Sequence, residues 1–419
     1  MSKPLLLFRG PVKTLSGYGS HSRDILKSLY DMDLFEIKID SSTWGNTPMT
    51  ALDTEKNLFH SWIEGNITTT LSSVPDIYIQ VTVPNEFQRR GRYNIGITAG
   101  IETTIAPKSW VDGINRMDKV ITTSTFSRDV LLQTVYNEND KVTGKLIKQY
   151  KIEVPLEILH EGVDTSIYTK EESKLDLDLK EDFNYLFVGH WLKGDIGQDR
   201  KDVSMLIKCF CESFNDTEDS PGLVLKTSSA TFSVKQRELL RERIQSITSR
   251  YSNPPSVYLL FGQLTDEEMN QLYNHPKIKS MITLTKGEGF GRPLLEFSMT
   301  GKPIIASNWS GHKDFLPMDK AIMLGGKLTQ VHESAVDDFI LKDSKWFTSN
   351  YNEVVEVLKI VKEKYDEFLV KSEELMVENK TKFSLDTITN KFKTILEPLL
   401  VEKPKKTKLV LPELTKIEK

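Results

Sequence analysis

Two glutamates on either side of a glycine-rich turn are the strongest chemical signal in the sequence. Glu288 lies in the turn Gly287–Gly291, and Glu296 lies eight positions further on, inside a helix predicted over Arg292–Met299. The glycines let a ligand approach the backbone closely, and the start of a helix offers free N–H groups to a phosphate. Carboxylates accept hydrogen bonds from paired hydroxyls. The pattern predicts a site for a polyhydroxylated phosphate ligand; a glycine turn with two solvated glutamates is the alternative.

Two cations, Arg200 and Lys201, precede a helix predicted over Asp202–Phe214. Cations are disfavoured at a helix N-terminus unless an anion is close. Both an ammonium and a guanidinium suit a phosphate, so we expect this pair to bind a diphosphate. A solvated start of the helix is the alternative.

A second glycine turn follows the first predicted strand and opens a helix, with Gly17, Tyr18 and Gly19 as candidate ligand contacts. His21 comes directly after this turn. We expect it either to reach a cleft from the first turn of the helix or to lie on the helix surface, and the sequence favours neither.

Glu102 and Thr103 follow a strand predicted over Tyr93–Thr98. Ligands of open α/β sheets bind at the C-terminal ends of the parallel strands. Glu102 is therefore a candidate base or ligand for a second substrate, with Thr103 beside it. A carboxylate that caps a helix or forms a salt bridge is the alternative for Glu102.

Short apolar runs alternate with helical patterns in two series, which predicts βαβ units and two doubly wound, Rossmann-like α/β domains. We place these domains at residues 1–167 and 183–384, with a charged linker at 168–182. We expect a helix at about 385–400 to cross back to the first domain, and a basic tail at 401–419. The predicted strands are Leu5–Phe8, Phe35–Ile39, Ile77–Val81, Tyr93–Thr98, Val120–Thr123, Ile152–Leu159, Tyr185–Val188, Leu223–Thr227, Val257–Phe261, Ser280–Leu284 and Pro303–Ser307. The other predicted helices are Ser20–Tyr30, Thr125–Val135, Val234–Arg250, Asp266–Asn274, Asn352–Asn379 and Leu385–Leu400.

The composition excludes several classes of protein. A chain of 419 residues, 38% apolar and 27% charged, is typical of a folded protein of two or three domains. A net charge of −4 provides no strong field toward nucleic acid or a membrane. Two cysteines are too few for the disulfide framework of a small secreted protein. No apolar run has the length of a signal-peptide core or of a membrane span, so we expect a cytoplasmic protein. No residue spacing is typical of a metal site, and we interpret the alternation Asp176-Leu177-Asp178 as structural.

Five short motifs, in register along nearly the whole chain, resemble the retaining GT-B glycosyltransferases, especially family 4. Glu288 and Glu296 match the E-x7-E motif of that family. The other matching segments are Ser16–Gly19, Leu159–Asp164, Tyr185–Gly189 with Asp199–Asp202, and Gly301–Ser307. The resemblance implies two domains that face each other across a cleft. It also implies retaining transfer from a nucleotide-sugar, such as a UDP-sugar, without a cofactor or a metal.

The resemblance further implies roles for single residues. Glu296 would bind the ribose, Glu288 a hydroxyl of the transferred sugar, and Lys201 with Arg200 the diphosphate. The remaining donor contacts would be Gly289, Phe290, Gly291 and Leu295. The candidate catalytic residues are then Glu288, Lys201, Glu102 and His21. His190 stands where the family has an arginine, so one phosphate ligand is missing or titratable.

A Rossmann-type nucleotide-binding protein or dehydrogenase is the competing class. Ser16–His21 departs from the G-x-G-x-x-G pattern, and Asp40 is the only acidic candidate at the end of the second strand. A catalytically inactive relative is disfavoured because Glu288, Glu296 and Lys201 are all present.

The segments Ser16–Arg23 and Ile95–Thr104 resemble glycosyltransferases of large tailed bacteriophages, which implies hydroxymethylated pyrimidine in DNA as a candidate acceptor. Candidate acceptor contacts are Glu102, Thr103, Arg89, Arg90, Arg92 and the lysines of the tail. A cell-surface glycan, a lipid or a protein is the alternative acceptor. A lipid is disfavoured because no basic amphipathic face stands out near the first domain.

Overall fold

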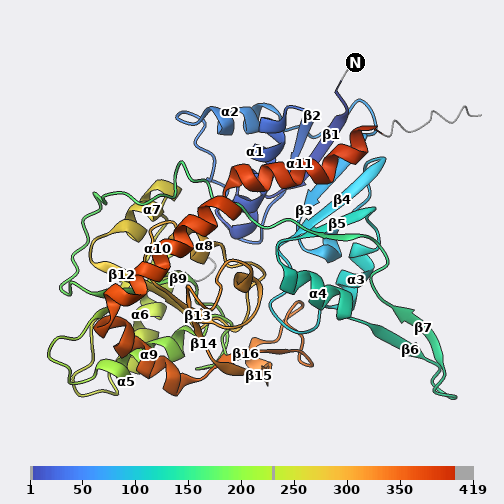
Figure 1. Cartoon of the computed structure of the whole chain (residues 1–419). Helices are drawn as coiled ribbons and strands as arrows, with labels where there is room; N and C mark the ends of the chain where they lie inside the picture. The colour runs from blue at the N-terminus through green and yellow to red at the C-terminus, as the bar shows by residue number, and fades with distance from the viewer. Residues whose placement is uncertain (1–2, 229–231, 402–419) are drawn as a thin grey trace, which may run out of the picture.

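Two six-stranded parallel sheets, each covered by helices, form the body of the molecule (Figure 1). The computed structural model describes residues 3–228 and 232–401. The strand order is β2-β1-β3-β4-β5-β8 in the first sheet and β11-β10-β9-β12-β13-β14 in the second. The order reverses between β1 and β3 and between β9 and β12, and such switch points are where ligands bind in doubly wound sheets. The two predicted doubly wound sheets are therefore present.

The predicted strands are all found: Ile77–Val81 and Tyr93–Thr98 have the predicted bounds, the others have shifted ends, and the strand Ile322–Leu324 was not predicted. The first sheet consists of β1 (Leu5–Gly10), β2 (Glu36–Ser41), β3 (Ile77–Val81), β4 (Tyr93–Thr98), β5 (Lys119–Thr122) and β8 (Leu156–Ile158). The second consists of β9 (Asn184–His190), β10 (Gly222–Ser228), β11 (Val257–Leu260), β12 (Ile278–Thr283), β13 (Ile304–Ser307) and β14 (Ile322–Leu324). Two antiparallel ribbons were not predicted: β6 (Tyr136–Asn139) with β7 (Leu146–Tyr150), and β15 (Gly326–Gln330) with β16 (Lys345–Ser349).

The helices of the first half are α1 (Gly17–Met32), α2 (Leu58–Gly65), α3 (Lys108–Ile114) and α4 (Thr125–Gln133). Those of the second half are α5 (Val203–Phe214), α6 (Val234–Thr248), α7 (Asp266–Asn274), α8 (Arg292–Ser298), α9 (Tyr351–Glu363), α10 (Tyr365–Lys382) and α11 (Leu385–Val401). Helices α2 and α3 were not predicted. No helix in the described part of the chain is long and apolar enough to cross a membrane.

The single helix predicted over Asn352–Asn379 is wrong, because the chain breaks at Lys364 between α9 and α10. Helix α9 packs on α5 through Val354 and Leu358, whereas α10 packs on α8 through Leu375. Phe368, near the start of α10, still packs against the cluster that contains Val354 and Leu358, and Leu375 lies in the other cluster, so α10 crosses from one to the other.

The segment 168–182 has no regular secondary structure and runs along the second sheet. Leu175, Leu177 and Leu179 pack toward its core, while Asp176 and Asp178 between them are exposed. This period-two alternation is that of an extended chain on an apolar surface, so the structural interpretation of these aspartates is confirmed.

Helix α11 lies across the first sheet, as Figure 1 shows, although it is far from that sheet in sequence. Ile388, Phe392 and Leu396 are buried in the core of the first sheet beside Leu26 and Leu29 of α1. The hydroxyls of Ser28 and Thr389 are 2.7 Å apart. The predicted tail 401–419 falls outside the described residues, apart from Val401 at the end of α11.

Candidate active site

Charged residues that follow strands of both sheets meet where the two domains face each other. Lys201, after β9, donates a hydrogen bond to Oε1 of Glu288, after β12. The guanidinium of Arg200 is 3.5 Å from Oε2 of Glu288 and 3.8 Å from Oε1 of Glu102, which follows β4 of the first sheet. The structure thus brings together three of the four candidate catalytic residues, along with Arg200.

The pKa values of the two carboxylates in this cluster are shifted in opposite directions. Burial alone would raise the pKa of Glu288, but the adjacent Lys201 and Arg200 outweigh burial and lower it to about 2. Burial raises the pKa of Glu102, and Arg200 offsets only part of that effect. Glu288 is therefore a fixed anion, whereas Glu102 holds a proton more readily than an exposed glutamate does.

The glycine turn is shaped by the facing domain as much as by any ligand. A Cβ atom on Gly287 would lie 2.0 Å from the carbonyl oxygen of Glu102, and one on Gly289 would lie 2.0 Å from that of Ala99. The hydroxyl of Ser124 also donates to the carbonyl of Gly289, at 2.6 Å. Only glycine permits this close approach between the two backbones, a requirement that the sequence alone did not reveal.

A buried ion pair that the sequence did not indicate lies behind the cations. Nζ of Lys286 is 2.9 Å from Oδ2 of Asp202, and the two side chains are 1% and 0% exposed. Burial raises the pKa of Asp202 to about 6 despite the neighbouring Lys286. The backbone N–H of Lys286 donates to the carbonyl of Arg200 at 2.7 Å. This pair therefore holds the Arg200–Lys201 turn against the glycine turn.

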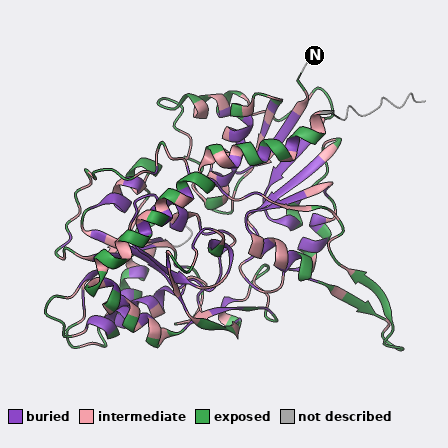
Figure 2. Ribbon diagram, in the orientation of Figure 1, coloured by how far each residue is buried: buried purple, intermediate pink, exposed green. Residues whose placement is uncertain are grey.

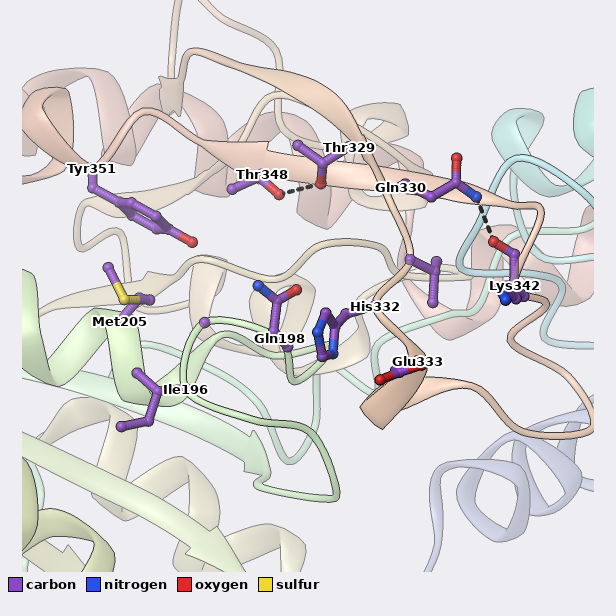
Figure 3. Close-up of a pocket in the computed structure, with 12 residues that line it drawn as sticks. Ile196, Gln198, Met205, Thr329, Gln330, His332, Glu333, Lys342, Thr348 and Tyr351 are labelled. Atoms are coloured by element: carbon purple, nitrogen blue, oxygen red, sulfur yellow. Dashed lines mark hydrogen bonds between the residues drawn. The ribbon is translucent and has the colours of Figure 1, made fainter.

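A cavity of about 610 Å³ lies on the other side of this ion pair and is drawn in Figure 3. Its twelve lining residues all come from the second domain, so it is distinct from the cleft between the domains. Thr348 and Tyr351 line it, and their hydroxyl oxygens are 3.3 and 3.5 Å from Nζ of Lys286. These two side chains separate the buried ion pair from the cavity.

Arg292 forms an ion pair with Glu296, the second glutamate of the E-x7-E motif. Its Nε donates to Oε1 of Glu296 at 2.7 Å, and its other end bonds to Asp24 of α1 and lies 3.7 Å from Glu161. Burial raises the pKa of both Glu161 and Glu296 to about 7, and Arg292 only partly offsets it. Tyr273 donates to the other oxygen of Glu296, at 3.3 Å. The guanidinium of Arg292 thus links Glu296, the residue predicted to bind the ribose, to Asp24 and Glu161 of the first domain.

Hydrogen bonds to other residues of the first domain fix its glycine turn. Ser16 caps α1 by accepting from the N–H of Gly19, and a Cβ on Gly19 would lie 2.2 Å from the carbonyl oxygen of Thr14. The hydroxyl of Tyr18 bonds to Thr98 and to the N–H of Ala99, both at the end of β4. A Cβ on Gly17 would meet nothing, so the backbone there is open to a ligand.

His21 is buried, and neither ring nitrogen has a hydrogen-bond partner among the described residues. Burial and the nearby charge of Arg292 lower its pKa to about 3. The ring is therefore neutral, and the alternative of a solvent-exposed helix position is excluded.

Two of the predicted donor contacts are core residues. Phe290 is buried against Phe315, and Leu295 is fully buried in the same cluster. Both side chains pack into the core of the second domain, Leu295 from α8 and Phe290 from the turn before it, so they contact a ligand at most through their backbone. His190 does not replace the family arginine as a cation: desolvation, then the charges of Lys201 and Arg200, lower its pKa.

The predicted acceptor arginines are not brought to the cleft. Arg89 pairs with Asp118, Arg90 with Asp40 and Arg92 with Asp76. They precede β4, whereas Glu102 follows it, and a six-residue strand is about 20 Å long. Thr103 is fully buried and donates to the carbonyl of Ile105, so its hydroxyl is engaged within the loop. The structure thus gives the predicted DNA contacts no support.

Within residues 3–228 and 232–401, no group of three or more His, Cys, Asp and Glu side chains is arranged to hold a metal ion.

No protein-family model and no curated protein sequence matches this chain. Its two facing doubly wound sheets nevertheless define the GT-B fold, which confirms the predicted fold class. One solved structure of this fold is sucrose-phosphate synthase from Thermosynechococcus elongatus, with a TM-score of 0.64 and 13% identity over 95% of this chain and 99% of that one. HepE from Anabaena, solved with UDP and glucose, has a TM-score of 0.61 and 12% identity over 94% and 100% of the two chains. A glycosyltransferase from Rickettsia africae has a TM-score of 0.55 and 13% identity over 96% and 100%.

Proposed function

We propose that this protein is a retaining glycosyltransferase that transfers a sugar from a UDP-sugar to an acceptor hydroxyl without a metal. The meeting of Lys201, Glu288 and Glu102 at the facing strand ends of the two sheets is the observation that carries this proposal. The similarity to HepE, which was solved with UDP and glucose, supports a uridine nucleotide as the donor.

The cations would act on the leaving group. During transfer, the bond between the anomeric carbon and the diphosphate oxygen breaks, and a bond to the acceptor oxygen forms on the same face of the sugar. Negative charge grows on the departing oxygen, and Lys201 and Arg200 are held in place to stabilise it. The proton of the acceptor hydroxyl passes to the departing diphosphate.

The carboxylates would position the two substrates. Glu288, a fixed anion, accepts from a hydroxyl of the transferred sugar, and Glu102 accepts from the acceptor hydroxyl and orients its oxygen. The close contact between the glycine turn and the Ala99–Glu102 loop excludes water, which would otherwise compete as acceptor.

Hydroxymethylated pyrimidine in DNA stays a prediction from the sequence, with a glycan, a lipid or a protein as alternatives. Our proposal extends only to an acceptor hydroxyl, because the arginines that would have contacted DNA are paired with Asp118, Asp40 and Asp76.

A panel of labelled UDP-, GDP-, ADP- and dTDP-sugars, incubated with the protein and no acceptor, tests the proposed function. We expect slow hydrolysis of a UDP-sugar, unchanged by EDTA, and NMR of the first product should show the anomer of the donor. Hydrolysis of none of these donors, loss of activity with EDTA, or the inverted anomer would contradict the proposal. Adding hydroxymethylated DNA, glycans and lipids to the active donor then identifies the acceptor.

Replacing Glu296 with alanine is expected to raise the Kd for UDP by about 10- to 100-fold, measured by calorimetry. A charge-assisted hydrogen bond contributes about 1.5–3 kcal/mol, and the variant loses such an acceptor for the ribose hydroxyls. Tyr273→Phe is the matched control, because it removes one partner of Glu296 and leaves the carboxylate in place. An unchanged Kd in Glu296→Ala would show that this carboxylate binds no ribose.

A further inference from the structure

The β6–β7 ribbon is an arm that projects from the first domain into solvent, as Figures 1 and 2 show. Its two strands pair only with each other. The base is held to the body, where Tyr136 donates to the carbonyl of Ala106 at 2.6 Å and Lys108 lies 3.6 Å from the ring centroid of Tyr150. Every residue from 141 to 149 is exposed.

The arm carries three lysines, Lys141 and Lys145 at its turn and Lys148 opposite Glu138 on the paired strand. Lys141, Lys145 and Lys148 have no carboxylate within ion-pair distance among the described residues. The arm also carries two carboxylates, so three lysines and two acidic residues give it a net charge of +1. Asp140 accepts from the N–H groups of Val142 and Thr143, and Glu138 accepts from the hydroxyl of Tyr150.

Three aliphatic side chains lie among these lysines. Val142 is 93% exposed, Ile147 62% and Leu146 57%. An isolated two-stranded ribbon is marginally stable in water and gains nothing from exposing such groups. Three exposed aliphatic side chains on one short ribbon favour an interaction site over a solvated loop.

We propose that this arm docks the first domain onto an anionic lipid surface. The headgroup region of a bilayer offers negative charge to the lysines and, just beneath it, an apolar layer for Val142, Leu146 and Ile147. Nucleic acid would pair with the lysines and leave the aliphatic side chains in water.

The sequence analysis disfavoured a lipid acceptor because no basic amphipathic face stood out near the first domain, and it did not predict this arm. From Tyr136 to Val142 the arm reaches about 20 Å at the usual rise per residue. It therefore presents its charges clear of the body of the domain, where a flat surface can contact them.

Sedimentation of the full chain with vesicles tests this proposal without any nucleotide-sugar, so its result is independent of the proposed function. We expect binding to vesicles of equal phosphatidylglycerol and phosphatidylcholine, little binding to phosphatidylcholine alone, and release by 0.5 M NaCl. Each lysine near an anionic surface contributes about fivefold in affinity. Lys141→Ala, Lys145→Ala and Lys148→Ala together should then weaken binding by about 100-fold.

Two further variants separate this arm from general charge effects. Val142→Ser, Leu146→Ser and Ile147→Ser should also weaken binding, whereas Lys235→Ala, Arg237→Ala and Arg241→Ala on α6 should not. Thermal melting confirms that each variant is folded. The proposal is overturned if the wild type ignores anionic vesicles, if the arm variants bind them as the wild type does, or if the arm instead mediates binding to duplex DNA or self-association in sedimentation velocity.

Discussion

Lys201→Ala is expected to lower kcat for the UDP-sugar by about 10²- to 10³-fold, with a much smaller change in donor affinity. Loss of one fixed donor to a developing oxyanion typically has an effect of this size. Lys201 is paired with Glu288 before the reaction, so its largest gain comes when the departing diphosphate acquires charge. Steady-state kinetics on the active donor measure kcat and kcat/KM separately.

Lys320→Ala is the matched control for this result, because it also removes a lysine–glutamate pair of the second domain, one that involves none of the candidate site residues. It should leave both kinetic constants unchanged. If Lys201→Ala raises only KM, the lysine contributes equally to ground-state and transition-state binding, and its assigned role in the chemical step is wrong.

Lys286→Met is expected to lower the free energy of unfolding by about 3–5 kcal/mol. The substitution leaves Asp202 fully buried with no cation, and breaking one partner of a buried ion pair has a cost of this order. Urea denaturation of the purified chain measures the difference. Activity should fall as well, because the Arg200–Lys201 turn loses its anchor on the glycine turn.

The double variant Lys286→Met with Asp202→Asn separates charge from packing. Asp202 has φ of 53°, a left-handed conformation that asparagine adopts more readily than most residues. With no charge left to bury, the double variant should recover most of the lost stability. If Lys286→Met alone is as stable as the wild type, the buried carboxylate of Asp202 does not need Lys286 as a partner.

The sequence predicted those site residues whose position depends only on one strand and on the loop that follows it. Glu102 follows β4, Lys201 follows β9 and Glu288 follows β12, and parallel strands bring such positions to one edge. Asp24 and Glu161 were missed as partners of Arg292, because their contact depends on how the two domains face each other. No local pattern contains that information.

Two other errors have local causes. Phe290 and Leu295 lie among ligand-type glycines and glutamates, but both side chains are buried in the core of the second domain, Leu295 within α8 and Phe290 in the turn before it. The arm was missed because residues 136–150 are mostly polar, with no alternating apolar residues and no buried face, and hydrophobic periodicity detects strands through such a face.

The placement of α11 in the core of the first sheet has a consequence for how the protein is made. Synthesis proceeds from the N-terminus, so the whole first sheet, through Ile158, leaves the ribosome before Leu385 of α11 is joined. At about 5–20 residues per second, the roughly 230 intervening residues take about 10–45 s. During that interval the groove that Ile388, Phe392 and Leu396 will fill is open on the nascent chain. The domain that emerges first is therefore completed last, and until then a chaperone or a second nascent chain can reach its exposed apolar surface.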